Sequence, residues 1–489
     1  MKGPVINYLA LLFCTIILLF SCNRIDTVGF DKETVTQKNV SIAHSIKVTH
    51  QEAQGIANMF MHSGTGSDML QTKSENSKRV SSTATVRDDG QDLMYIFNYE
   101  DGGFVIVGAT RNYYPILAYS DKGSFVLRKD MGPVDVWLDE TKVSIKNSIS
   151  IDDVTKAQMQ NLWARYDGSY VDPTQQLLSA RRPQTRSAGE DSCWAEIERL
   201  QALYGSHGWT FLPLSQVENV FDDAGLSSYY DDICYSATQN HSALNETVIG
   251  YKNTPKYTQR GPLIPTTGWN QDPPFNILCP NHYPAGCTAV AAAQLLYYYE
   301  YPSDAFWVSD NFIWAEIMEY LDSSPFTKQP NLIKRVGQIF HMTYSSGGSY
   351  ASNVDVVSGL VDSLGYAATL KNQSYSTVKG EIFNNRPVLM TGSKTLLGTG
   401  HCWVCDGAIE NISNQITFFT ENQPYGAGTF TQGMYTNSSP GVIGGIYYYY
   451  FHMKFGNDSI ESDDGWYADN NLPSNSNYQY NRKDITVHL

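Results

Sequence analysis

The chain of 489 residues predicts an α+β fold, and three patterns support this prediction. The β-rich runs 93–99 and 103–108 are separated by a Glu-Asp-Gly-Gly turn, which is typical of a hairpin. An alanine-rich run that begins at Cys287 is strongly helical. The run 400–407 alternates like a strand, starts at a glycine and ends at an Asp-Gly turn. Both helices and hairpin-connected strands are therefore expected.

The N-terminus has the pattern of a targeting segment. Met1 and Lys2 precede the apolar stretch 9–20, which is too short to span a bilayer comfortably and fits a signal peptide. Cys22 follows a small residue where this stretch ends, and the arrangement resembles the lipobox of bacterial lipoproteins, in which that cysteine is lipidated. We therefore predict a signal over 1–21 and a protein of the bacterial cell envelope, lipid-anchored at the outer membrane or surface, or secreted after processing. A plain secretory signal with an incidental cysteine is the alternative.

The chain is acidic, with a formal net charge of −15 at pH 7. It has no basic stripe for phosphate contacts, which argues against a nucleic-acid partner. No second stretch of about eighteen apolar residues follows the N-terminal one. Contact with a membrane is therefore expected through the lipid anchor only.

Cysteine spacing argues against a dense disulfide framework. Eight cysteines occur, and the six that follow the N-terminal segment lie at wide intervals, at positions 193, 234, 279, 287, 402 and 405. The pair Cys402 and Cys405 has the spacing of a thioredoxin-type redox motif or a zinc site, but it lies on a predicted strand and not at a helix start. Residues three apart on a strand face opposite ways. Two buried thiols are expected, with no metal and no cofactor.

The region 22–145 is predicted to be a first α+β domain. Thr49 and Glu52 have the form of a helix capping box, and apolar residues follow at helical spacing, namely Ala53, Ile56, Ala57 and Phe60. A Ser/Thr/Asp-rich loop to about residue 92 is expected next. The hairpin, a β-rich segment at 115–120 and a helix at 134–140 complete the domain.

The region 146–190 is predicted to be a linker. Its second half is polar and contains Arg181, Arg182 and Arg186. Exposed basic linkers are readily cleaved, so a processing region is expected here. An ordinary inter-domain linker is the alternative.

The region 191–489 is predicted to be the second domain. Its first part, up to residue 255, has one helical pattern at 193–204 and gives no functional signal. Pro284 and Gly286 precede Cys287, so this thiol is expected in the first turn of its helix. Free N–H groups and the helix macrodipole there favour a thiolate, which lowers the pKa of a thiol and makes it a nucleophile.

His401 lies at the mouth of the predicted strand 400–407. A nucleophilic thiol such as Cys287 needs an imidazole to take its proton, and a third group to hold the ring. A cysteine that starts a helix, with a histidine on a strand more than a hundred residues later, is the chain order of papain-like peptidases.

Three blocks of the sequence closely resemble the streptopain-like family of cysteine peptidases. They contain Gln271, Cys287 and His401 and read Trp-Asn-Gln-Asp-Pro-Pro-Phe-Asn, Ala-Gly-Cys-Thr-Ala-Val-Ala-Ala-Ala-Gln and Gly-His-Cys-Trp-Val-Cys-Asp-Gly. Other blocks that look like the family's occur in order at 342–351, 364–366, 386–392 and 451–467, and 95–108 with 115–120 resembles its inhibitory propeptide. The likeness covers most of the chain except about 146–255.

The resemblance implies a papain-like two-part catalytic domain, with a helical part and an antiparallel β part, preceded by an α+β propeptide domain. It implies an endopeptidase made as a zymogen, which hydrolyses polypeptides through an acyl-enzyme and is inhibited by its own propeptide. Carried over by position, Cys287 is the nucleophile and His401 is the general base and acid. Gln271, sixteen residues before the cysteine, would donate its side-chain amide to the oxyanion beside the Cys287 N–H.

One position departs from the resemblance. Where the family has an Asn that orients the imidazole and a Trp that shields it, this chain has Lys454 and Phe455. Phe455 can still shield, but Lys454 is a donor only, and its charge disfavours an imidazolium. Either Asp406, Asn422 or Asn457 orients the ring, or the triad has decayed and the protein is a peptide-binding or inhibitory pseudopeptidase. A triad without its third member keeps residual activity, so a cysteine peptidase is the prediction.

Overall fold

The computed structural model describes residues 45–63, 78–168, 187–223, 226–239, 243–253, 256–266, 268–309, 312–317, 328–393, 400–413, 416–418, 442–443, 446–456, 463–469 and 481–489. The predicted signal, Cys22, the three linker arginines, Asn422 and Asn457 lie outside these residues. None of the helices in these ranges has the length and apolarity of a membrane span.

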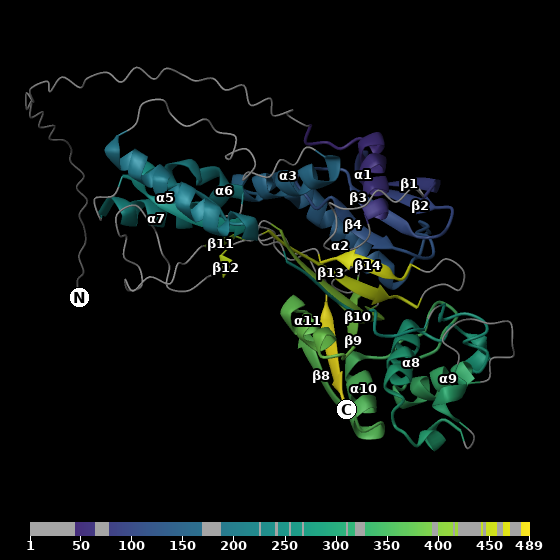
Figure 1. Ribbon diagram of the computed structural model, residues 1–489. Coiled ribbons are helices and arrows are strands. Elements are labelled where there is room, and N and C mark those ends of the chain that lie inside the picture. Colours follow the sequence, from purple (N-terminus) through teal and green to yellow (C-terminus); the bar gives the residue numbers. More distant parts are fainter. Residues whose placement is uncertain are drawn as a thin grey trace, which may run out of the picture. The chain divides into compact units, whose positions relative to one another are not determined.

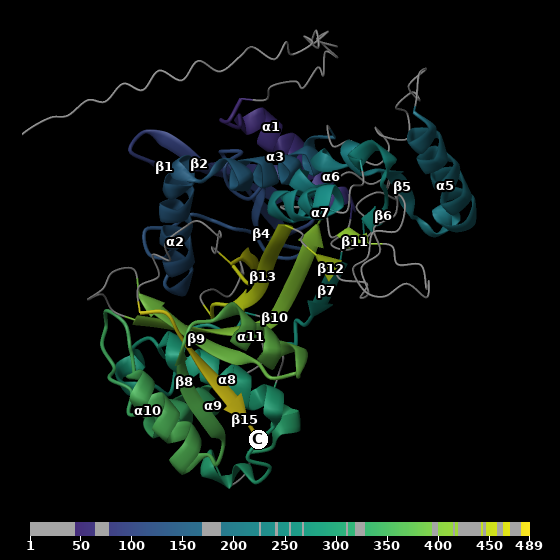
Figure 2. The same ribbon diagram turned by 90° about the vertical axis from the view of Figure 1, so that its left-hand side faces the viewer.

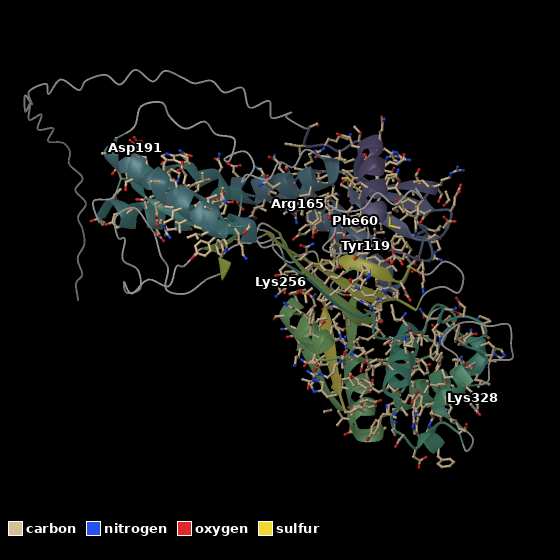
Figure 3. All side chains as sticks on the ribbon, viewed as in Figure 1. Phe60, Tyr119, Arg165, Asp191, Lys256 and Lys328 are labelled. Carbon is tan, nitrogen blue, oxygen red and sulfur yellow. The ribbon has the colours of Figure 1, made fainter. Side chains whose placement is uncertain are left out.

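The first part of the described chain packs three helices on four strands. Its elements are α1 (His50–Ser63), β1 (Val80–Asp88), β2 (Gln91–Tyr99), β3 (Phe104–Gly108), β4 (Ile116–Ser120), α2 (Pro133–Asn147) and α3 (Asp153–Asp167). The predicted capping box is confirmed, since the Glu52 N–H donates to Thr49 Oγ1 at 3.3 Å and the Thr49 N–H donates to Glu52 Oε2 at 2.7 Å. Phe60 of α1 packs on Tyr119 of β4 with ring centroids 4.8 Å apart (Figure 3).

Two elements of this part differ from the sequence prediction. The strand β1 lies where a loop was expected, because it pairs only with β2 at the edge of the sheet, and its residues, which are exposed or half-buried except for Val86, need no apolar alternation. The helix α3 lies inside the predicted linker, yet Trp163 is fully buried and its Nε1 donates to the Tyr113 carbonyl at 2.7 Å. The helix α3 therefore belongs to the first core.

One antiparallel sheet joins this part to the C-terminal strands, in the order β1-β2-β3-β4-β14-β13-β10-β9-β15-β8, with β7 also paired to β10. The additional strands are β7 (Lys256–Arg260), β8 (Ala367–Asn372), β9 (Val388–Ser393), β10 (Gly400–Ser413), β13 (Ile446–Lys454), β14 (Gly465–Ala468) and β15 (Lys483–His488). The joint is the pairing of β4 with β14, where Ala118 lies opposite Tyr467. The first part thus continues the sheet that contains His401.

The two faces of the C-terminal strands belong to two different hydrophobic cores. The helices α8 (Cys287–Tyr299), α9 (Lys328–Ile339) and α10 (Asn353–Ser358) share a core with Cys402 and Val404 of β10. Trp403 and Cys405 of the same strand belong to the core of the first part, as does α11 (Tyr375–Phe383). In Figures 1 and 2, α8 and α9 lie together. The expected two-part arrangement of helices and antiparallel strands is confirmed.

The region without a functional signal forms a small layer of its own. Its elements are α5 (Ala188–Tyr204), β5 (Thr210–Pro213), α6 (Glu218–Asp223), α7 (Ser227–Gln239) and β6 (Val248–Asn253), together with β11 (Ile416–Phe418) and β12 (Val442–Ile443) from the later chain. The strands form a separate sheet in the order β12-β11-β6-β5. The predicted helix at 193–204 is present and begins earlier, because Ser187 and Glu190 form a capping box.

Candidate active site

Cys287 is the first residue of α8, as the sequence predicts. The residue before it, Gly286, has φ +89 and ψ 133, outside the helical region. A Cβ at Gly286 would lie 2.3 Å from Met342 Cε and 2.7 Å from the Ser349 carbonyl oxygen. Only a glycine fits this conformation and this space, so Gly286 fixes where the helix starts and where the thiol lies.

The strand β10 brings the His401 region to this helix start. The N–H of Cys402, the residue after His401, donates to Cys287 Sγ at 3.3 Å. His401 pairs with Gly392 of β9 in the sheet register, and its side chain is partly exposed. The predicted nucleophile and the predicted base therefore come from distant parts of the chain to one place.

The Cys287 thiol is buried, with 6% of its surface exposed. Burial raises its pKa above the usual value, although the Cys402 N–H on β10 and the Thr288 hydroxyl and backbone N–H groups at the helix start act in the opposite direction. The helix start alone predicts a lowered pKa, as expected from the sequence. Burial outweighs this effect in the folded chain.

A cavity of about 320 Å³ opens beside the pair. The residues that line it include several with hydroxyl or amide side chains and are Thr288, Tyr350, Ala351, Asn353, Thr391, Gly392, Ser393, Gly400, His401, Cys402 and Asn481. Two of the amides are fixed by hydroxyls, since Asn353 Nδ2 donates to Thr391 Oγ1 and Asn481 Nδ2 donates to Ser393 Oγ, both at 3.1 Å. Such a lining can hydrogen-bond a peptide backbone.

Gln271 lies in the segment that leads to the helix start. Its carbonyl accepts a hydrogen bond of 2.8 Å from the N–H of Ala285, two residues before Cys287. Its side chain is partly exposed. Gln271 and Cys287 are therefore tied to each other through the backbone.

Asp406 is fully buried, and both of its carboxylate oxygens are bound away from His401. Oδ1 lies 2.5 Å from His452 Nδ1, and Oδ2 accepts the Ile264 N–H at 2.9 Å. The charge and the hydrogen bond of His452 hold the pKa of Asp406 below its usual value, against the effect of burial. The sequence did not indicate His452, because nothing in a single strand pattern shows which distant residue a buried carboxylate will meet.

Lys454 and Phe455 lie at the end of β13, with Lys454 opposite Val404 of β10. Lys454 Nζ donates to the Thr266 carbonyl and lies 3.3 Å from Asp464 Oδ2. Phe455 is buried, and its ring centroid is 5.9 Å from that of Trp403, two residues after His401. The lysine thus bonds to the segment before Gln271.

The helix α2 packs against the same strands from the other side. A Cβ on Gly392, a residue of the cavity lining, would lie 3.0 Å from Val136 Cγ1 of α2. Trp137 Nε1 donates to the Ala468 carbonyl at 3.2 Å, and Arg482 Nη1 donates to Glu140 Oε2 at 3.0 Å. The helix is therefore held to the strands around the cavity by apolar contact, a hydrogen bond and a buried ion pair.

Cys402 and Cys405 are both buried and both free thiols, on opposite sides of β10, as the strand pattern predicts. Burial raises the pKa of each well above the usual value. Among the residues that the structure describes, no group of His, Cys, Asp and Glu is arranged to hold a metal ion.

Comparison with known proteins gives two family matches. Residues 45–145 match the Spi protease inhibitor family, and residues 269–467 match the Peptidase C10 family. No curated protein matches the chain. Among solved structures, the chain is similar to a cysteine-to-alanine mutant fragment of prointerpain A from Prevotella intermedia, with a TM-score of 0.43 and 15% identity over 83% of this chain and 98% of that one.

Proposed function

Because this chain belongs to the Peptidase C10 family, the streptopain family, and has a Spi protease inhibitor domain ahead of its peptidase domain, we propose that it is a cysteine endopeptidase made as a zymogen. The main supporting observation is the 3.3 Å hydrogen bond from the Cys402 N–H to Cys287 Sγ. It joins the start of α8 to the strand residue that follows His401, and so brings the elements of the proposed nucleophile and base together.

The proposed reaction uses residues of this chain alone. Cys287 gives its proton to His401, and the sulfur attacks the carbonyl carbon of a peptide bond. The negative charge moves to the carbonyl oxygen, which the Cys287 N–H and the Gln271 amide stabilise. When the C–N bond breaks, His401 returns the proton to the leaving amine, and water then hydrolyses the thioester. The cavity beside His401 would bind the polypeptide through its hydroxyl and amide groups.

The inhibitor domain is proposed to keep this site inactive. The helix α2 packs on Gly392 of β9 from the side of the first core, behind the cavity, and burial raises the pKa of the Cys287 thiol. Both features favour a latent form that needs removal of the inhibitor domain. Cleavage in the segment after α3 would separate the two domains.

The alternative function is a peptide-binding or inhibitory pseudopeptidase. Lys454 favours it, because an ammonium group cannot accept a hydrogen bond from an imidazole at the position where the family has an orienting Asn. A large gain in turnover on Lys454→Asn would support this decayed-triad interpretation.

The test of the nucleophile is Cys287→Ala. We expect the processed variant to lose casein hydrolysis entirely, because no other group can form the thioester. Cys234→Ala is the matched control, since Cys234 is a partly exposed free thiol on α7, and it should keep the wild-type rate. Casein hydrolysis by the Cys287→Ala chain would show that the nucleophile is wrongly assigned.

We propose further that Cys22 is lipidated and anchors the protein to the cell envelope, with no other contact to the membrane. The apolar stretch 9–20 and the small residue before Cys22 support this proposal. Cells fed labelled palmitate should label the wild-type protein, and Cys22→Ser should abolish the label and release the protein from the membrane fraction. Unchanged labelling of Cys22→Ser would refute the anchor.

A further inference from the structure

The segment 261–271 joins β7 to the turn before α8 and brings Gln271 to the helix start. It contains no regular helix or strand among its described residues, so its course depends on individual contacts. Near its beginning, the Ile264 N–H donates to Asp406 Oδ2 at 2.9 Å. At its end, the Gln271 carbonyl accepts the Ala285 N–H at 2.8 Å. The middle needs an anchor of its own if the Gln271 amide is to keep one direction.

Lys454 supplies a contact in this middle part. Thr266 is fully buried, and its carbonyl accepts a hydrogen bond from Lys454 Nζ. The Thr266 hydroxyl donates to Gln294 Oε1 of α8 at 2.6 Å. A buried carbonyl requires a partner, and a bond from a charged donor is about twice as strong as a neutral one. Lys454 therefore ties the segment to β13, while Gln294 ties it to the helix of Cys287.

The lysine is itself fixed in place. Only 4% of its side chain is exposed, and a buried ammonium is unfavourable unless it is paired. Asp464 supplies the charge, with Oδ2 3.3 Å from Lys454 Nζ, and its Oδ1 accepts the Phe455 N–H at 3.0 Å. One carboxylate thus holds both the side chain of Lys454 and the backbone of the next residue.

Gly456 makes a second approach to the same segment. It has φ +65, and a Cβ there would lie 3.0 Å from Val290 Cγ1 of α8 and 3.6 Å from the Trp269 carbonyl oxygen. Trp269 is two residues before Gln271. The run 454–456 therefore borders the segment at two points.

We propose that Lys454 is a positioning residue for the oxyanion site: by binding the Thr266 carbonyl and Asp464, it fixes the segment that aims the Gln271 amide at the oxyanion. The proposal rests on the proposed peptidase function. In the resembling family, the residue at this position orients the imidazole. In this chain, we assign position 454 to the oxyanion donor Gln271 and not to the imidazole.

The experiment measures kcat and KM for a peptide amide substrate, and the rate at which iodoacetamide alkylates Cys287, on processed enzyme. Alkylation forms no oxyanion, so it reports the thiol and base without Gln271. We expect Lys454→Met to lower kcat by about tenfold to a hundredfold, with KM and the alkylation rate within about twofold of wild type. Lys454→Arg should restore most of kcat, because it keeps the charged donor.

A double-mutant cycle separates positioning from general damage. If Lys454 acts through Gln271, then Lys454→Met should cost little more in the Gln271→Ala background. Asp464→Asn keeps an acceptor for the Phe455 N–H but loses the charge that pairs with Lys454, so it should also lower kcat. This variant replaces Lys454→Met in the test if Lys454→Met does not fold. Lys379→Met is the matched control, since Lys379 of α11 pairs with Glu410 away from this segment.

Three results would overturn the proposal. In the first, the fold-losses in kcat from Lys454→Met and Gln271→Ala multiply in the double variant. In the second, Lys454→Met lowers the alkylation rate of Cys287 as much as it lowers kcat. In the third, Lys454→Asn raises kcat. Failure of the proposed function itself would look different, because Cys287 would then resist alkylation in the processed wild-type protein.

Discussion

At the scale of single residues, the conformation of Gly286 decides where Cys287, the proposed nucleophile, lies. Its positive φ lies outside the helical region, so α8 begins at the next residue, Cys287. The close approach of Met342 and the Ser349 carbonyl leaves no room for a side chain. The sequence indicated the helix start from Pro284 and Gly286, but not the packing that makes a glycine necessary.

Gly286→Ala should therefore displace Cys287. The left-handed backbone conformation disfavours alanine by about 1 kcal/mol or more, and the clash adds to this cost. We expect a lower melting temperature and a loss of more than about tenfold in kcat/KM. Gly380→Ala is the control, because Gly380 of α11 has open space around its Cα and alanine is the better helix former there. Wild-type activity and stability in Gly286→Ala would contradict this account.

At the scale of elements, α2 is a helix of the inhibitor domain that packs on the strands of the peptidase domain. Its Glu140 lies in a buried ion pair with Arg482, which also lies over the Trp403 ring at 4.8 Å. Asp469 and Asp484 are the other buried carboxyl groups near Arg482, and burial raises the pKa of both, that of Asp484 to about 6. One arginine thus faces three buried acids.

This arrangement makes the stability of the full chain depend on pH. Burial raises the pKa of Glu140 to about 7, despite the attraction of Arg482, whereas an unfolded glutamate titrates near 4.5. Between these values the folded chain keeps a proton that the unfolded chain has lost. The contribution of Glu140 to the free energy of unfolding is therefore fully present below about pH 4.5, and it is lost as the pH rises through about 7.

Glu140→Gln should reduce this dependence. In denaturant titrations of the inactive Cys287→Ala chain at pH 5 and pH 8, the drop in unfolding free energy should be smaller by about 2 kcal/mol in the variant. Asp139→Asn, on the exposed side of the same helix, should leave the drop unchanged. An unchanged drop in Glu140→Gln would contradict the assignment to Glu140.

At the scale of the whole molecule, the inhibitor domain and the catalytic strands form one sheet through β4 and β14. The two large cores lie on opposite sides of β10, so Trp403 and Cys405 pack toward the inhibitor domain while Cys402 and Val404 pack toward α8. Removal of the inhibitor domain would therefore uncover one face of the strand that contains His401.

The zymogen interpretation predicts a change in the reactivity of Cys287. A buried thiol with a raised pKa reacts slowly with a thiol-directed epoxide, and a thiolate in an open site reacts quickly. We expect the protein cleaved between α3 and α5 to react at least about tenfold faster than the full-length chain. The Cys287→Ala chain gives the background from the other thiols. Equal rates, typical of bulk thiols, before and after cleavage would rule out the zymogen interpretation.

The local features of this protein could be predicted from its amino-acid sequence. The capping box at Thr49, the hairpin at 93–108, the start of α8 at Cys287 and the strand at His401 depend on helical and strand periodicity and on nearby Gly and Pro residues. Neighbours in the chain settle such features, so a single sequence is enough to predict them.

Features that depend on distant segments became evident only in the folded chain. Two such features are contacts between residues far apart in the chain, the bond of Lys454 to Thr266 and the pair of Asp406 with His452. A third is the burial of Cys287, which depends on the segments that pack around it. The strand β1 and the helix α3 were missed because an edge strand and a helix in a polar stretch gain their stability from the elements they meet. These contacts are stabilised by burial and pairing between distant segments, so a local sequence pattern does not predict them.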